Sequence, residues 1–294
     1  MTEFIQQLVN GLSIGSVFAL IALGYTMVYG IIKLINFAHG DIYMLGAYVG
    51  FFVSQRITGF GGFIIAMLCA MTFCAIVGVL TDRLAYKPLR NASRITALIT
   101  AMGVSYFLEY LMVFLVGPDK RAFKTPFENV HFNIGGITFT LTTVIIVAVS
   151  IVLMIALQYI IHKTKIGKAM RAVSADPQAA QLMGIDVDRT ISVTFAIGSA
   201  LAGAAGVLIG IHYNTIDPLM GMIPGLKAFI AAVFGGIGII PGAMIGGVSI
   251  GIIQTLAGGY ISTLWQDAIV YGLLIIILVF KPAGLLGKAV KEKV

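Results

Sequence analysis

The sequence contains few charged residues. Asp, Glu, Lys and Arg make up only 11% of its 294 residues, whereas soluble domains carry about 25%. Hydrophobic residues reach 59%, and the mean hydropathy is +1.01. Runs of about 18 or more apolar residues recur along the chain, and a soluble core cannot bury so much apolar surface. The composition therefore excludes an ordinary soluble domain and indicates a membrane protein.

Cysteine and the common catalytic motifs are also scarce. Cys69 and Cys74 lie five residues apart inside one apolar segment, a spacing that suits core packing better than a disulfide or a metal site. HExxH and CxxC are absent. The pairs Gly167-Lys168 and Gly287-Lys288 are each followed by alanine, so neither belongs to a phosphate-binding P-loop. We therefore expect a chain that is not an enzyme and binds no cofactor itself.

Most of the Lys and Arg residues, 13 of 19, fall into three clusters, and the net charge is +7. Each cluster lies between or after apolar segments, as the positive-inside rule expects of cytoplasmic loops. The basic balance therefore points to membrane topology and membrane lipid, and not to nucleic acid. The clusters are Arg83, Lys87, Arg90 and Arg94; Lys163, Lys165, Lys168, Arg171 and Arg189; and Lys281, Lys288, Lys291 and Lys293.

Nine apolar segments predict an all-α polytopic membrane protein in which residues 1–294 form a single domain. Placing the basic clusters in the cytoplasm puts loop 162–190 inside, and loop 117–140 and the N-terminus outside. Segment 42–57 is short and 223–258 could form a re-entrant hairpin, so eight spans is the alternative count. The segments lie at 8–32, 42–57, 62–81, 95–116, 141–161, 191–211, 223–237, 243–258 and 264–281.

The external loop contains a hairpin signal. In VHFNIGGITF, residues 130–139, apolar residues alternate on either side of Gly135-Gly136. Two glycines between alternating strands are typical of a two-residue hairpin turn. The predicted hairpin is either a docking surface or only a cap.

Two stretches interrupt the apolar runs: INFAHGDIYMLGAY at 35–48 and GGIGIIPGAMIGG at 235–247. Paired interruptions at membrane depth are typical of transporters, because irregular backbone is tolerated there only where it lines a cavity or is buried in protein. Asp41 can cap a helix that begins at Ile42. The topology favours an ordinary polar connection at the cytoplasmic edge; substrate contact and gate geometry are the alternatives. The helix-break and pathway candidates are Asn36, His39, Gly40, Asp41, Gly236, Pro241 and Gly242.

The two breaks also share a faint pattern. Gly40, Met44 and Gly46 in the first match Gly242, Met244 and Gly246 in the second. We take this match as a weak sign of an internal repeat.

Glu109 is a carboxylic acid inside the apolar run ALITAMGVSYFLEYLMVFLVG. An ionisable residue within a span is a functional candidate by default. Glu109 could meet a substrate ammonium in the pathway, or it could stay protonated and bond to a neighbouring helix. We favour the second role, because the sequence shows no evident basic partner.

The phrase SADPQAAQLMGID, residues 174–186, predicts a short capped helix in the second basic loop. Asp176 is a good N-cap, Pro177 suits the first helical position, and Gly184 can stop the helix in the left-handed conformation. A helix of about two turns is marginal alone in water and needs a partner surface. We expect it to present small apolar residues to a groove on another protein, with packing under its own spans as the alternative. These residues are Ala179, Ala180, Leu182 and Met183.

Four motifs resemble LivH-type permeases of branched-chain amino acid ABC importers, and the resemblance runs nearly end to end. The motifs are GYTMVYGIIKLINFAHGDIYMLGAY at 24–48, RLAYKPLR at 83–90, GKAMRAVSADPQAAQLMGI at 167–185 and KAFIAAVFGGIGIIPGAMIGG at 227–247.

The resemblance implies the ABC importer permease fold in a bacterial inner membrane, with residues 176–184 as the helix that docks on the ATPase. It also implies three kinds of partner: a second, LivM-type permease subunit, two ATP-binding subunits, and a periplasmic or lipid-anchored substrate-binding protein. The expected cargo is a branched-chain amino acid. Related permeases move urea or short amides, which remain the alternative substrates, and an ion-coupled secondary transporter using Glu109 is the alternative class.

Overall fold

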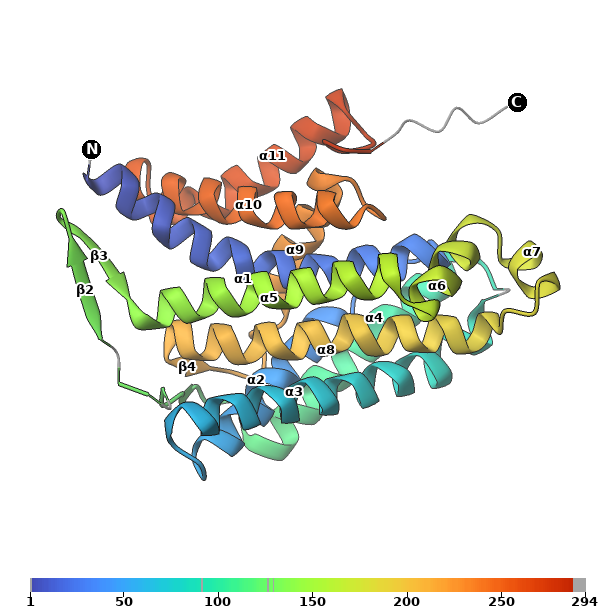
Figure 1. Ribbon diagram of the computed structural model, residues 1–294, viewed down its shortest axis with the longest axis horizontal. Helices are drawn as coiled ribbons and strands as arrows, with labels where there is room; N and C mark the ends of the chain where they lie inside the picture. Colours follow the sequence, from blue (N-terminus) through green and yellow to red (C-terminus); the bar gives the residue numbers. More distant parts are fainter. Residues whose placement is uncertain (1, 91, 126, 129, 288–294) are drawn as a thin grey trace.

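Long apolar helices dominate the computed structural model, which describes residues 2–90, 92–125, 127–128 and 130–287 (Figure 1). Seven helical stretches in this part of the chain are long and apolar enough to cross a membrane. The protein is therefore an all-α, multi-pass membrane protein. The helices that carry these stretches are α1 (Thr2–Ile32), α3 (Gly59–Thr81), α4 (Arg94–Val116), α5 (Leu141–Lys163), α8 (Val187–Tyr213), α10 (Ile240–Tyr260) and α11 (Gln266–Phe280), which forms a stretch of 18 residues with the 3-10 turn before it.

Two shorter helices occupy the remaining expected segments. Helix α2 (His39–Ser54) has 16 residues and α9 (Met222–Gly235) has 14. At 1.5 Å per residue they extend only about 21–24 Å, less than the roughly 30 Å of a hydrocarbon core. Each follows an irregular segment after a long helix. All nine predicted segments thus form helices, but two of them are too short to cross the membrane alone.

Helices α1, α2 and α3 have a counterpart of reversed direction in α8, α9 and α10. The contact between α1 and α10 corresponds to the contact between α8 and α3. The contact between α2 and α8 corresponds to the contact between α9 and α1. This arrangement is an inverted repeat, a common plan in transporters. The matched glycines of the two sequence breaks do not reflect it, because α2 corresponds to α9, whereas Gly242, Met244 and Gly246 belong to α10.

Glycine allows the central helices to approach closely. A Cβ on Gly15 of α1 would lie 2.8 Å from the Val248 Cα of α10, and one on Gly203 of α8 would lie 2.8 Å from the Ala70 carbonyl oxygen of α3. Small residues at helix contacts are the usual route to tight packing in lipid. The Cys74 thiol is buried and donates to the Ile42 carbonyl at 3.3 Å, whereas Cys69 is exposed on the outer face of α3.

One end of the bundle carries the N-terminal turn of α1 and a β-hairpin, with β2 (His131–Ile134) paired antiparallel to β3 (Ile137–Thr140) (Figure 1). This confirms the predicted hairpin. The Gln6 side chain fastens it to α1, because it accepts from the Thr138 N–H at 2.9 Å and donates to the Thr138 carbonyl at 3.1 Å. Nearby, β1 (Arg121–Ala122) pairs with β4 (Thr215–Ile216).

The opposite end carries the segments predicted to be cytoplasmic. Helix α3 continues into a π-helical turn, Asp82–Tyr86, and a 3-10 turn, Lys87–Leu89, while α6 (Lys165–Ala175) and α7 (Pro177–Leu182) join α5 to α8. Another 3-10 turn, Thr263–Trp265, precedes α11 at the hairpin end. In the third basic cluster, Lys288, Lys291 and Lys293 lie outside the described residues.

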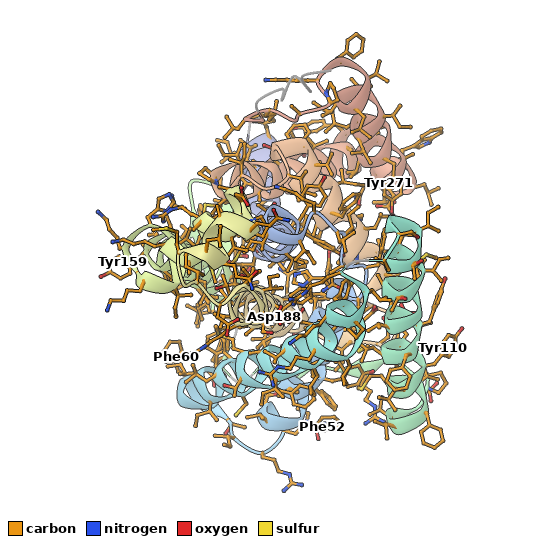
Figure 2. The ribbon with its side chains drawn as sticks, turned by 90° about the vertical axis from the view of Figure 1, so that its right-hand side faces the viewer. Phe52, Phe60, Tyr110, Tyr159, Asp188 and Tyr271 are labelled. Atoms are coloured by element: carbon orange, nitrogen blue, oxygen red, sulfur yellow. The ribbon has the colours of Figure 1, made fainter. Side chains whose placement is uncertain are left out.

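Helices α1 and α8 are mostly buried, whereas α4, α5 and α11 expose large apolar side chains at the rim. Viewed along the bundle, Tyr110 of α4 and Tyr159 of α5 point away from the centre (Figure 2). Such a surface needs lipid or another membrane protein as its solvent.

Candidate functional site

Helix α7 is short and capped at both ends. The Asp176 carboxylate accepts from the Gln178 N–H at 2.9 Å and the Ala179 N–H at 3.0 Å, and Pro177 occupies the first turn. At the other end Gly184 has φ +81°, and the Ile185 N–H donates to the Ala180 carbonyl at 3.0 Å. This pattern is a Schellman stop, which satisfies the last carbonyls. The sequence predicted this local geometry correctly.

The faces of α7 differ from the expectation. Ala180 is buried against the rest of the loop, whereas Leu182 is 89% exposed and Met183 83% exposed. The predicted set of presented residues is therefore wrong for Ala180, because the helix turns this side chain inward. Two large apolar side chains thus project from the end predicted to be cytoplasmic, without cover from the described part of this chain.

Short connections join the helices of the loop between α5 and α8. Thr164 caps α6 by accepting from the Gly167 N–H at 3.1 Å, and Asp186 caps α8 by accepting from the Arg189 N–H at 2.9 Å. Helix α6 is also fastened to the end of α1, since the Ser174 hydroxyl donates to the Gly30 carbonyl at 2.6 Å. Single capping residues join α5 to α6 and α6 to α7, and residues 183–186 join α7 to α8, so α7 is closely linked to α1, α5 and α8.

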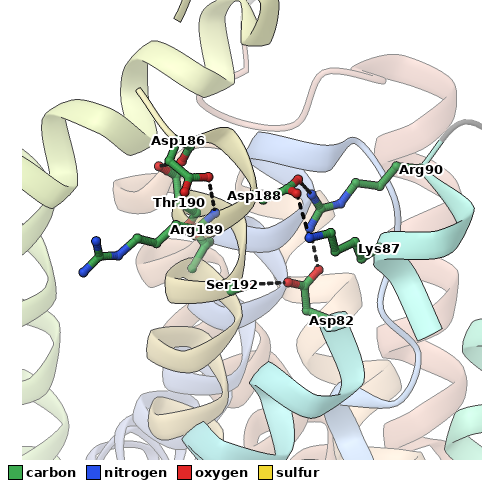
Figure 3. A network of polar contacts seen from close by, with 9 residues as sticks. Asp82, Lys87, Arg90, Asp186, Asp188, Arg189, Thr190 and Ser192 are labelled. Atoms are coloured by element: carbon green, nitrogen blue, oxygen red, sulfur yellow. Dashed lines mark hydrogen bonds and ion pairs between the residues drawn. The ribbon is translucent and has the colours of Figure 1, made fainter. Parts of the chain in front are cut away.

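A charged network joins the end of α3 to the start of α8 (Figure 3). Asp82 is fully buried; it accepts from Arg90 Nη2 at 2.9 Å and from the Ser192 hydroxyl at 2.5 Å. Arg90 also binds Asp188, which lies 2.8 Å from Lys87 Nζ. The sequence analysis placed Lys87 and Arg90 in a topological cluster and did not anticipate their carboxylate partners. Asp188 lies 98 positions after Arg90, so no local pattern links the two residues.

The first helix break lies deeper than expected. Helix α2 begins at His39, so Asp41 is inside the helix and caps nothing. Instead Asp41 Oδ2 accepts from the Ser105 hydroxyl at 2.5 Å, and Ser105 is the middle residue of α4. Asp41 therefore lies beside the middle of α4, and the expected connection at the cytoplasmic edge does not describe it.

Neighbouring residues fix this position. A Cβ on Gly225 would lie 2.9 Å from Gly40 Cα, so the start of α9 packs directly on the start of α2. The His39 ring packs edge-on against Tyr25, with centroids 4.8 Å apart. Asn36 Oδ1 accepts from the Tyr86 hydroxyl at 3.0 Å, which ties the irregular segment to the π-helical turn. These contacts hold the break between α1, α4 and α9.

Glu109 meets Asp41 at this break. The two carboxyl groups interact, and their residues are only 5% and 1% exposed. They line a cavity of about 190 Å³. Its other walls come from α1, α4, α9 and the segment before α2, and they include Tyr25, Phe37, Met102, Ser105, Tyr106, Met222, Leu226 and Phe229.

The second break is at the end of the bundle that carries α7 and does not join the first. Gly236 has φ +111°, Pro241 opens α10, and a Cβ on Gly242 would collide with the Gly235 carbonyl. The Leu286 N–H donates to that carbonyl at 3.1 Å. Gly236, Pro241 and Gly242 thus make a tight turn between α9 and α10, and the structure separates them from Asp41 and Glu109.

Comparison with known proteins decides the family. Residues 7–279 match the family described as the branched-chain amino acid transport system / permease component. The chain belongs to this permease family. It is 42% identical over 305 residues to the high-affinity branched-chain amino acid transport system permease protein LivH of Escherichia coli K12, covering 99% of this chain and 98% of that protein.

Other relatives agree. The permease is 40% identical over 302 residues to BraD of Pseudomonas aeruginosa, a high-affinity branched-chain amino acid transport system permease protein, covering 99% and 98% of the two chains. It is 33% identical over 287 residues to a probable branched-chain amino acid transport permease protein LivH of Methanocaldococcus jannaschii, covering 91% and 88%. The permease is therefore a multi-pass inner-membrane protein with a role in transport.

Proposed function

We propose that this chain is the permease subunit of an ATP-driven importer and forms part of the translocation pathway for branched-chain amino acids. The observation that carries the proposal is the near full-length similarity to permeases named for this transport, on a fold with an inverted repeat and short helices. Urea and short amides are the alternative cargo. An ion-coupled secondary transporter is disfavoured, because such a protein needs no ATPase.

Energy reaches the permease from separate ATPase partners in this proposal. The contact is α7, which projects Leu182 and Met183 from the cytoplasmic end and is linked through α6 to α1 and α5. Two ATP-binding subunits dock at this end, one on each permease. The second permease is a homologous, LivM-type subunit, and an external substrate-binding protein delivers the cargo at the end that carries the hairpin.

The first helix break belongs to the pathway in this proposal. Gly40 and Gly225 bring α2 and α9 together beside α4, and Asp41 and Glu109 face the cavity there. Asn36 and His39 hold the backbone of the break in place. Gly236, Pro241 and Gly242 instead shape the cytoplasmic turn that leads from α9 into α10.

Uptake by cells tests the function. The chain is expressed with the permease, ATPase and binding-protein genes that neighbour it, in a bacterium without its own branched-chain amino acid importers. We expect uptake of radiolabelled leucine, isoleucine and valine that depends on this chain and on ATP. Uptake of urea or acetamide, with none of the three amino acids, would reject the proposed cargo.

A further inference from the structure

We propose that the cavity beside Asp41 and Glu109 holds the transported amino acid at the middle of the membrane. The carboxyl pair receives its ammonium group, the N-terminus of α9 receives its carboxylate, and the apolar wall receives its side chain. This inference rests on the proposed function and adds the residues and the chemistry of recognition.

The carboxyl pair suits a primary ammonium group. Two neighbouring carboxyls repel each other when both are ionised, so the pair holds one proton and leaves one negative charge. Ser105 fixes the Asp41 carboxyl from α4. An ammonium group offers three donors and one positive charge, which complements the carboxyl oxygens that line the cavity. Glu109 therefore has a use that a purely structural acid would not need.

No cation of the described residues already fills this role. Lys227 is the cation inside neighbouring α9, and its Nζ lies 2.6 Å from Asp267 of α11. No ion pair is recorded for Asp41 or Glu109 in the described part of the chain. A negative charge in the membrane is costly unless it is paired, so the pair favours a cationic occupant.

The start of α9 supplies the opposite sign. Gly221, Met222 and Gly225 line the same cavity as the carboxyl pair. The first N–H groups of a helix have no intrahelical partner, and the N-terminal end of its dipole is positive. In other transporters the N-termini of interrupted helices face anionic substrate groups in this way. A zwitterion can thus bridge the gap between α2 and α9.

The remaining wall suits an aliphatic side chain. Phe37, Met102, Leu226 and Phe229 are apolar and surround the rest of the cavity. Its volume of about 190 Å³ is below the roughly 300–1,000 Å³ of sites for drug-sized ligands. Urea and short amides lack the two charges and carry at most a small alkyl group, so the three parts together favour a branched-chain amino acid.

Photo-leucine, a diazirine analogue of leucine, tests the site in the wild-type importer. The complete complex in proteoliposomes is illuminated during ATP-driven uptake, and the modified peptides are identified by mass spectrometry. We expect labels on α4 and α9 near Met102, Leu226 and Phe229, and competition by excess leucine. Labels confined to other helices, in a complex that transports leucine, would overturn the proposal.

Substitutions test the charges. Glu109→Gln and Asp41→Asn keep the size of the side chain, and each should reduce leucine uptake at least about tenfold, a factor equivalent to about 1.4 kcal/mol. Glu3→Gln, at an exposed position in the first turn of α1, is the matched control and should transport normally. Thermal stability in detergent and binding of the ATPase subunits show whether each variant is folded.

The outcomes separate the two proposals. A wild-type complex that imports no branched-chain amino acid rejects the proposed function. A wild-type complex that imports leucine, with unchanged uptake in both charge variants, rejects this site alone. Where a variant fails to fold, the photo-leucine map of the wild-type protein decides.

Discussion

At the scale of single residues, the buried carboxylate of Asp82 is the centre of the polar network at the end of the bundle that carries α7. Its side chain is removed from water between the π-helical turn and α8, with Arg90 and Ser192 as partners. A buried charge that loses its partner is strongly destabilising, whereas an exposed ion pair contributes little. The same network contains both kinds, because Lys87 and Asp188 are about half exposed.

Arg90→Ala should therefore lower the free energy of unfolding by about 3–5 kcal/mol, because it leaves Asp82 buried and unpaired. Lys87→Ala is the matched control and should cost about 0–1 kcal/mol, because it breaks only an exposed pair. Thermal unfolding of the purified permease in detergent measures both. Equal melting temperatures for the two variants would show that Asp82 does not depend on Arg90.

At the scale of elements, α7 shows what local sequence can predict. Its two caps depend on Asp176 and Gly184, whose chemistry acts within a few residues, so the sequence specified them. Which face it turns inward depends on α6 and α8, so the sequence missed the burial of Ala180. The same limit explains why the position of Asp41 was not predicted. Its partner Ser105 is 64 residues away, and nothing in the sequence around Ser105 marks it as a partner.

Leu182→Arg should leave the permease folded and abolish its co-purification with the ATPase subunits and its uptake, because an unpaired charge buried at an interface costs several kcal/mol. Leu84→Arg is the matched control at an exposed leucine of the π-helical turn and should retain binding. Pull-down from detergent-solubilised membranes measures binding. Full ATPase binding by Leu182→Arg would exclude α7 as the docking element.

A substitution at Ala180 would have a different effect from one at Leu182, because Ala180 is buried. Ala180→Arg places a charge under α7, so it should lower permease abundance as well as ATPase binding. It is therefore a poor test of docking. Gly184→Val strains a position with φ +81° and should weaken binding less than Leu182→Arg does.

At the scale of the whole molecule, nine apolar segments were readable from the sequence because hydropathy is a property of the segment itself. The inverted repeat was not readable from the sequence, because it is a relation between packed helices. The faint match of Gly40 with Gly242 pointed to the wrong pair of helices, since glycines mark close contacts of many kinds. Family motifs identified the class, and only the structure placed Glu109 against Asp41.

The arrangement of the ends predicts the topology. Single cysteines at Ser93 and at Asn133 of β2, in a background with Cys69 and Cys74 replaced, should react with an impermeant thiol reagent from opposite sides of the membrane. A cysteine at buried Ala101 of α4 should stay unlabelled and serves as the control. Labelling of Ser93 and Asn133 positions from the same side would overturn the orientation.

The caps at Thr164, Asp176 and Asp186 link α5, α6, α7 and α8 in sequence, which makes communication along this loop reciprocal. The coupling free energy between two sites is the same whichever site is perturbed. If α7 docks on the ATPase as proposed, a loaded binding protein that shifts the outer ends of α5 and α8 also shifts the ATPase contact before any nucleotide is hydrolysed. In the proposed importer the loop would therefore report the presence of cargo to the ATPase as well as transmit ATP-driven closure, and an empty importer would hydrolyse less ATP.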